Sequence, residues 1–145
     1  MPLEPEILEA LKRIPLLAKE PAATLATLRL GGLTNRNYRI EAPSGCYVLR
    51  IPGEKTGDYI NRKVEAHNAR AAAAAKVNAE VLFLDEGDGL MLCRYLDDSV
   101  SMTPALFHQR KGAPGRAALA LRQMHRSGQR FEFRFELFSM IDDYL

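Results

Sequence analysis

Apolar and polar residues alternate along three short segments in the first third of the chain. In residues 24–30, 36–42 and 46–51 every second side chain falls on the same face, which is the pattern of a half-buried β-strand. The glycine pair at 31–32 and the Pro-Ser-Gly at 43–45 interrupt the alternation with turn residues. The pattern therefore predicts three antiparallel strands joined by short turns.

Helical spacing occurs on either side of these strands. Residues 4–19 carry apolar side chains three and four positions apart, and Pro15 breaks the pattern. Residues 58–75 show the same spacing and end in a run of alanines, which favour helix, with Asp58 as the predicted N-cap. The predicted inner faces consist of Ile7, Leu8, Leu11 and Ile14 in the first helix and Ile60, Val64, Ala71 and Ala75 in the second. One helix is therefore expected before the strands and one after the third strand.

Two further strands and a helical C-terminal part complete the pattern. Residues 80–86 and 89–96 are apolar runs around Gly-Asp-Gly at 87–89, which is a hairpin signal. Thr-Pro at 103–104 is typical of a helix start. Helices are further predicted over 115–126, ending at Ser127-Gly128, and over 136–145. This order of elements predicts an α+β fold with five antiparallel strands and one helix after the third strand.

Composition narrows the classes of function. The chain has 145 residues, of which 47% are hydrophobic and 26% charged, as in one ordinary globular domain. A net charge of +2 is too small to indicate a nucleic-acid partner, and we expect the arginine-rich stretch 108–134 to be a solvated face or to meet an acidic second lobe. No apolar run approaches the ~20 residues of a membrane span. The first residues lack the apolar core of a signal peptide, so a cytoplasmic location is expected.

Cysteines and histidines indicate neither a disulfide framework nor a metal site. Cys46 and Cys93 lie in apolar strand-like runs, so we expect both to be reduced and buried, with a disulfide between them as the alternative. The three histidines (His67, His108 and His125) are far apart and lack the spacing of metal ligands. The sequence therefore predicts no zinc site.

The first turn has unusual chemistry for a plain hairpin. It reads GGLTNRNY over residues 31–38. Gly31 and Gly32 can bring backbone N–H groups close to an anion because no Cβ intervenes, and Thr34, Asn35 and Asn37 add polar side chains. These features suit a phosphate cradle, and they also suit a hairpin loop that simply needs glycine. The stretch is not the phosphate-binding G-x-x-x-x-G-K-[ST] motif.

An arginine lies among apolar residues on the third predicted strand. Cys46, Val48 and Arg50 share one face of that strand, and the following helix carries Glu65. A strand cation that holds phosphates and is oriented by a helix carboxylate is the arrangement of protein kinases. The alternative is an exposed arginine on an edge strand and a solvated Glu65 that pairs with Arg62 on its own helix. The residues by themselves leave both interpretations open.

The features taken in order resemble a known family. GGLTNRNY, YVLRIPG (47–53), INRKVEAHNAR (60–70) and LRQMHRSGQRFEFRFELFSMIDDYL (121–145) are similar to the bacterial choline/ethanolamine kinase-like phosphotransferases, relatives of aminoglycoside phosphotransferases. The resemblance extends from about residue 28 to the end of the sequence. It implies a protein-kinase-like N-lobe over residues 1–96, followed over 97–145 by the crossover and first helices of a C-lobe that is missing from this chain.

The resemblance also implies a function and a site. The family's activity would be ATP-dependent transfer of phosphate to the hydroxyl of an amino alcohol such as choline or ethanolamine; thiamine and aminoglycosides stay open as acceptors. The resemblance implies that Gly31, Gly32, Thr34 and Asn35 line the phosphates, that Glu65 orients Arg50, and that backbone groups of Arg94, Tyr95 and Leu96 read the adenine edge. Val48 and Leu92 either contact the adenine ring or belong to the core. Before the fourth strand the chain departs from the family, with Val-Asn-Ala at 77–79 in place of Gly or Pro.

The motifs that carry catalysis in this family do not occur in the 145 residues. Its catalytic aspartate and metal ligands come from motifs of the HGD-x4-N and IDFE type, and Asp142 and Asp143 fit neither. We therefore expect no catalytic residue and no metal ligand here, Mg²⁺ only in a full-length enzyme, and a truncated chain that is inactive alone. The alternatives are a non-catalytic module that docks a protein partner, and a β-rich fold unrelated to kinases. The apolar tail predicts a surface for the missing lobe or for an oligomer, and its residues are Phe131, Phe133, Phe135, Leu137 and Phe138.

Overall fold

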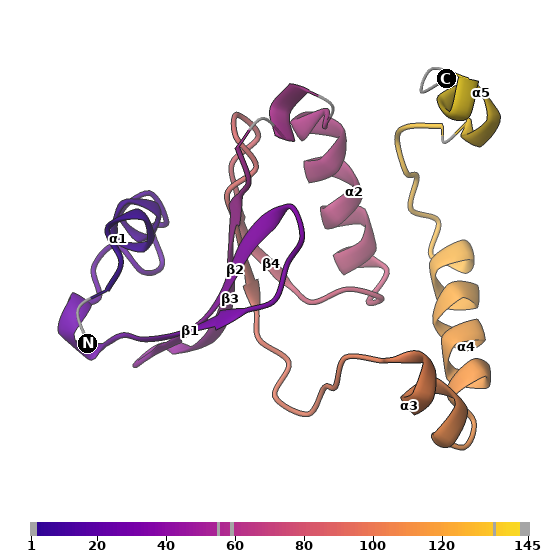
Figure 1. Ribbon diagram of the computed structural model, residues 1–145, viewed down its shortest axis with the longest axis horizontal. Coiled ribbons are helices and arrows are strands. Elements are labelled where there is room, and N and C mark those ends of the chain that lie inside the picture. Colours follow the sequence, from indigo (N-terminus) through magenta and orange to yellow (C-terminus); the bar gives the residue numbers. More distant parts are fainter. Residues whose placement is uncertain (1–2, 55, 59, 135, 143–145) are drawn as a thin grey trace.

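A single antiparallel sheet lies at the centre of the fold (Figure 1). The computed structural model describes residues 3–54, 56–58, 60–134 and 136–142. Its strands are β1 (Ala26–Leu30), β2 (Asn35–Ala42), β3 (Gly45–Pro52), β4 (Val81–Leu84) and β5 (Met91–Arg94), in the spatial order β1-β2-β3-β5-β4. Its helices are α1 (Pro5–Lys12), α2 (Arg62–Ala74), α3 (Pro104–Gln109), α4 (Ala113–Arg126) and α5 (Leu137–Asp142). The predicted α+β fold, with α2 after the third of five strands, is confirmed.

One face of the sheet packs against α1 and the turn that follows it (Figure 1). Alternation places Tyr38 and Ile40 of β2 and Leu49 of β3 on this face, and each is at most 2% exposed. The helical side of this core consists of Ile7, Ala10, Leu11, Ile14 and Leu17. Burial, together with the hydrogen bond that the Tyr38 hydroxyl donates to Glu6 Oε1 at 2.7 Å, raises the pKa of Tyr38 to about 12. The alternation predicted over residues 36–42 thus gives β2 one buried face.

Helix α2 covers only part of the opposite face. Its Ala66 packs against Leu84 of β4 and Met91 of β5, and Ala71 is buried one turn farther along. Small side chains at these positions let the helix approach the strands closely. On the same face, at the far edge of the sheet, Leu28 of β1 is 59% exposed. The half of this face over β1 and β2 is therefore open.

The start of α2 differs from the prediction. Asn61 is the N-cap, and its Oδ1 accepts hydrogen bonds from the backbone N–H groups of Lys63 and Val64 at 3.2 Å each. Asp58 lies in a short 3-10 turn (Thr56–Asp58) that precedes the helix, so its assignment as N-cap was wrong. Both Asp and Asn are suitable N-cap residues, so the sequence offers two positions for the start of the helix. The packing of the loop determines which of the two caps it.

The inner face of α2 is also shifted from the predicted one. Ile60 and Val64 are only half-buried, whereas Arg62 and Ala66 are buried. Ala71 and Ala75 are buried as predicted. Ile60 lies before the first residue of the helix, and Arg62 and Ala66, which are one turn apart, face inward at its start.

Helix α1 is shorter than its apolar pattern. It ends at Lys12, and the chain then turns, with the N–H of Ile14 donating to Leu11 O at 3.1 Å. Pro15 disfavours the helical conformation in the residue before it, so the helix stops early. Ile14 and Leu17 are nevertheless buried, because the turn packs on the same core as the helix.

The C-terminal helices form an arm beyond α2 (Figure 1). Thr103 Oγ1 accepts from the N–H of Leu106 at 3.2 Å, which confirms the predicted helix start, and α4 ends before Ser127 as predicted. The arm is tied to α2 by a reciprocal pair of 2.8 Å hydrogen bonds between the Asn68 amide and the backbone N–H and C=O of Glu132. Phe131, Phe133 and Phe138 are exposed as expected. Phe135, Asp143 and Tyr144 lie outside the described residues, as do the side chains of Leu137 and Met140.

Two further expectations can be compared with the described residues. Cys46 and Cys93 are both free thiols, but they are half-buried rather than buried, because they face the side of the sheet that α2 covers incompletely. Burial still raises the pKa of the Cys93 thiol. Among the helices that the structure describes, none has the length and apolar character required to span a bilayer.

An exposed ion-pair cluster links α1 to the β4–β5 turn and allows a stability prediction. Arg13 Nη2 lies 2.6 Å from Asp85 Oδ2, and its Nη1 lies 2.7 Å from Asp88 Oδ2. The pKa of Asp85 is lowered first by the N–H of Gly87 and then by Arg13, and the pKa of Asp88 is lowered first by Arg13. Lowered carboxylate pKa values stabilise the fold above about pH 4, and this stabilisation is lost as the pH falls through the folded-state values.

Arg13→Ala should therefore lower the free energy of unfolding by no more than about 1 kcal/mol at pH 7, because these side chains are solvent-screened. Urea denaturation at pH 7 and pH 3 should show that the difference from wild type disappears at pH 3. Lys12→Ala serves as the control, since Lys12 pairs only with the exposed Glu9 of its own helix. A deficit of the same size at both pH values would contradict the assignment to these carboxylates.

Candidate functional site

The sheet register places the glycine turn beside Arg50. Arg50 of β3 is paired with Asn37 of β2 on one side and with Met91 of β5 on the other. Directly paired residues project from the same face of a sheet, so Asn37 and Arg50 are neighbours on the face that α2 partly covers. Asn37 Nδ2 donates to Gly31 O at 3.0 Å. The polar turn and the strand cation, which are separate in the sequence, thus belong to one local structure.

Arg50 and Glu65 form an ion pair. Arg50 Nη2 lies 2.9 Å from Glu65 Oε1, both side chains are 20% exposed, and Nη2 is also 3.3 Å from Gly89 O. The Nε of Arg50 is buried without a hydrogen-bond partner among the described residues. Strand β3 lies between β2 and β5, so the alternative of an exposed arginine on an edge strand is wrong. The structure therefore brings these two predicted site residues together.

Glu65 has a second cationic partner. Arg62 Nη1 lies 2.7 Å from Glu65 Oε2, and Arg62 is only 8% exposed. Its Nη2 donates to Thr56 Oγ1, and that hydroxyl in turn donates to Gly53 O at 2.8 Å. A solvated Arg62–Glu65 pair was one of the two interpretations that the sequence left open, and Thr56 was not among the predicted site residues. The i,i+3 spacing was the available signal, but burial of the pair could not be read from it.

Close backbone contacts explain the glycines of the turn. A Cβ on Gly32 would lie 2.3 Å from Asn35 O and 2.8 Å from Asn37 Nδ2, and a Cβ on Gly53 would lie 1.9 Å from Thr34 O. A Cβ on Gly31 would meet nothing within 4 Å. The turn is thus folded tightly onto the end of β3, while Gly31, Gly32 and Thr34 are exposed. The Oδ1 of Asn35 is buried without a hydrogen-bond partner among the described residues.

The predicted crossover after β5 is partly engaged by the sheet. The N–H of Arg94 donates to Glu80 O at 2.9 Å, and the N–H of Tyr95 donates to Cys46 O at 3.0 Å. These two donors are therefore committed to backbone pairing. Leu96 follows them with its side chain 53% exposed. The side chain of Arg94 forms an ion pair with Glu80, whose Oε2 lies 3.0 Å from Arg94 Nε.

On the open face of the sheet, apolar side chains lie on both sides of Arg39. Leu28, Arg39, Val48 and Cys93 form one cross-strand row, with Leu28 exposed and Val48 half-buried. Leu92 belongs instead to the core beside α1 and is 0% exposed, because it projects from the other face of the sheet. Of the two alternatives for Val48 and Leu92, the structure assigns Leu92 to the core and leaves Val48 on the open face.

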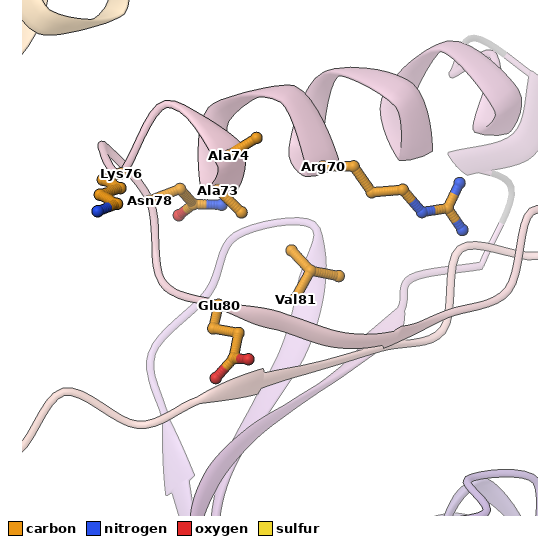
Figure 2. Close-up of a pocket in the computed structure, with 7 residues that line it drawn as sticks. All are labelled: Arg70, Ala73, Ala74, Lys76, Asn78, Glu80 and Val81. Atoms are coloured by element: carbon orange, nitrogen blue, oxygen red, sulfur yellow. The ribbon is translucent and has the colours of Figure 1, made fainter. Parts of the chain in front are cut away.

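A hollow of about 520 Å³ between the end of α2 and the start of β4 is shown in Figure 2. Its polar side chains do not converge: Arg70, Lys76 and Glu80 extend in different directions (Figure 2). Two of these charges are already paired, Arg70 with Glu86 at 2.6 Å and Glu80 with Arg94 at 3.0 Å. A binding site for a polar ligand needs groups that point toward a common centre, so this hollow is not the candidate.

The residues around Arg50 suit an anion rather than a metal ion. Two guanidinium groups share one carboxylate, which gives the Arg50–Glu65–Arg62 cluster a net charge of +1, and a glycine turn lies beside it. No three His, Cys, Asp or Glu side chains among the described residues are grouped to hold a metal ion.

Comparison with known proteins identifies the family. A model of the phosphotransferase enzyme family matches residues 26–140. The protein LicA of Haemophilus influenzae is 32% identical over 115 residues, a stretch that covers 79% of this chain and 33% of LicA. The structure of a choline/ethanolamine kinase family protein from Mesorhizobium loti is 48% identical with a TM-score of 0.81, over 96% of this chain and 44% of that protein.

A more distant structure has the same fold. LicA in complex with AMP superposes with a TM-score of 0.66 at 22% identity, over 83% of this chain and 41% of that one. The chain thus spans about a third of the curated relative and less than half of these solved structures. The family match includes all five strands of the sheet, and the fold of this chain is that of a partial protein-kinase-like N-lobe. This chain belongs to the phosphotransferase enzyme family, and within it to the choline/ethanolamine kinase-like proteins.

Proposed function

We propose that this chain forms the nucleotide-binding half of an ATP-dependent kinase that phosphorylates the hydroxyl group of an amino alcohol. The choice of acceptor is supported by the 48% identity to a choline/ethanolamine kinase family protein. The choice of nucleotide is supported by the AMP bound to the structurally similar LicA. The single observation in this structure that carries the proposal is the Arg50–Glu65 ion pair beside the glycine turn.

The phosphates would lie between the glycine turn and Arg50. A guanidinium can hold two phosphate oxygens at once, and the Arg50 Nε has no partner among the described residues. The exposed backbone of Gly31 and Gly32 lets phosphate oxygens approach closely, and Gly32 has no room for a Cβ. Thr34 and Asn35 supply polar groups at the far end of the turn. Glu65 orients Arg50 and does not itself contact the nucleotide.

The adenine would lie on the open half of the sheet, between Leu28 and the crossover. Leu28 and Val48 offer an apolar surface there, and the exposed Leu96 borders it. Since sheet pairing occupies the N–H groups of Arg94 and Tyr95, we assign the donor to the adenine edge to the N–H of Leu96. This narrows the three-residue prediction from the sequence to one donor.

Chemistry would need residues that these 145 do not supply. Phosphoryl transfer depends on positioning, on metal ions that neutralise the phosphates, and on a group that orients or deprotonates the acceptor hydroxyl. We propose that residues 1–96 bind the nucleotide, that 97–145 lead toward a second lobe, and that this chain alone binds ATP at about millimolar affinity without turnover. Metal-dependent ATP hydrolysis or choline phosphorylation by the pure chain would contradict this.

The proposal is tested by titrating the ¹⁵N-labelled chain with ATP and, separately, with adenosine. Arg50→Met should weaken ATP binding at least about tenfold, because a charge-assisted contact to phosphate is lost, while the affinity for adenosine should not change. Arg29→Met is the matched control, since it removes one positive charge from the neighbouring sheet edge on the opposite face. If ATP shifts no amide resonance of the wild-type chain, the non-catalytic binding module becomes the better interpretation.

A further inference from the structure

The carboxylate of Glu65 is shared by two arginines that face different surroundings. Arg50 lies on the open side of the pair, at 2.9 Å from Oε1, and is one-fifth exposed. Arg62 lies on the inner side, at 2.7 Å from Oε2, and is almost completely buried. One side chain is therefore available to a ligand and the other is not.

Arg62 is almost completely buried, and only a small part of it borders the hollow beside Gly53 and Thr56. Its two terminal nitrogens are directed to Glu65 and Thr56, and a Cβ on Gly89 would lie 2.8 Å from its Nη1. Gly89 has φ +87°, so the β4–β5 turn closes over the guanidinium with a residue that carries no side chain. Arg62 can thus influence a phosphate only through its neighbours.

The electrostatic consequence concerns Arg50. A lone Arg50–Glu65 pair would be neutral and would attract a phosphate weakly. Because Arg62 compensates the Glu65 carboxylate from behind, the three side chains together carry a charge of +1, and the accessible part of that charge is on Arg50. Glu65 can then orient Arg50 without cancelling its attraction for an anion.

Arg62 also connects the Arg50–Glu65 ion pair to the glycine turn. Its hydrogen bond to Thr56 continues through the Thr56 hydroxyl to Gly53 O, and Gly53 is packed directly against Thr34 O. On the other side, Asn37 joins Gly31 to the strand position next to Arg50. These contacts connect the Arg50–Glu65 ion pair to both ends of the glycine turn.

We propose that Arg62 is a positioning residue of the phosphate site: it holds the second oxygen of Glu65, so that Arg50 keeps its charge for the nucleotide, and through Thr56 it fixes the glycine turn against the ion pair. This inference rests on the proposed function. It differs from a purely structural role of Arg62, because it predicts that the effect of losing Arg62 depends on the charge of Glu65.

A double-mutant cycle on the full 145-residue chain tests the inference, with ATP dissociation constants measured by NMR titration at fixed ionic strength. Arg62→Gln should weaken ATP binding about tenfold, since Glu65 then neutralises Arg50 alone. Adding Glu65→Gln to Arg62→Gln should restore a large part of the affinity, because Arg50 regains its net charge. Arg62→Lys should likewise recover most of the loss. Arg70→Gln is the matched control, with the same charge change on an exposed arginine of α2 that pairs with Glu86.

The outcomes separate this inference from the proposed function. If the wild-type chain binds ATP and Arg50→Met abolishes binding while Arg62→Gln does not change it, only the role of Arg62 is overturned. It is also overturned if the double variant binds ATP no better than Arg62→Gln. A wild-type chain that binds no ATP overturns both. Should Arg62→Gln fail to fold by circular dichroism, Thr56→Val decides: about threefold weaker ATP binding, with shifts of the Gly31 and Gly32 amides, is expected, and unchanged affinity overturns the inference.

Discussion

Replacing Leu49 by alanine should lower the free energy of unfolding by about 2–5 kcal/mol, the range for large-to-small changes in a packed core. Leu49 is 0% exposed at the centre of β3, paired with Leu92 and facing the residues of α1. The cavity would open between two layers that are fixed by strand pairing on one side and by helix α1 on the other. The residues around this cavity can therefore relax little, and the expected loss of unfolding free energy lies in the upper half of that range. Urea denaturation followed by circular dichroism measures it.

Leu28→Ala is the matched control for this prediction. It removes the same atoms from the neighbouring sheet edge, at a side chain that is 59% exposed on the opposite face. The free energy of unfolding should change by less than about 0.5 kcal/mol. If adenine packs on this open face, the same variant should weaken the binding of adenosine. Equal destabilisation by the two variants would mean that the assignment of the two faces is wrong.

Gly32→Ala should produce the second large effect, a loss of about 1–3 kcal/mol in the free energy of unfolding, because an added Cβ overlaps backbone that cannot move independently. That Cβ would lie 2.3 Å from the carbonyl oxygen of Asn35, the first residue of β2. To relieve the overlap, the turn must withdraw from β2, which also breaks the contact between Asn37 and Gly31. We therefore expect ATP binding to be lost together with stability.

Gly31→Ala separates the general cost of removing a glycine from this specific overlap. Its Cβ would meet nothing within 4 Å, so the free energy of unfolding should stay within about 0.5 kcal/mol of wild type. The comparison needs only thermal and urea denaturation of both variants. Similar destabilisation by the two substitutions would show that the turn does not have the close approach of Gly32 to Asn35.

The candidate site is held together both by contacts within the glycine turn and by contacts between residues far apart in the sequence. The glycine turn is held locally by Asn37, whereas Arg50 is positioned by a helix that follows it in the sequence and by the β4–β5 turn that comes later still. The charges are also distributed over distant segments: Glu65 pairs with Arg50 on its more open side and with the buried Arg62 on its inner side. The proposed binding of a phosphate and the stability of the N-lobe would therefore depend on the same few contacts.

The type of most helices and strands, and their order, could be predicted from the sequence. Alternation predicted the strands that became β2 and β3, and Thr103 with Pro104 predicted a helix start. These features depend on side chains within a few positions of each other, so the pattern contains the physical cause. The same local reasoning, with the resemblance to a family, selected Arg50 and Glu65.

Which surfaces are buried, and which distant residues contact each other, could be learned only from the folded structure. The N-cap of α2 is Asn61 and not the predicted Asp58, and Arg62, the first residue of the helix, is buried. Leu92 went to the core because it projects from the face of the sheet that meets α1. Arg62 is connected through Thr56 and Gly53 to Thr34, and these contacts exist because the glycine turn folds back onto the end of β3. Such contacts arise from packing between distant segments, where the free energy of burial outweighs local preference, and no pattern within one segment records them.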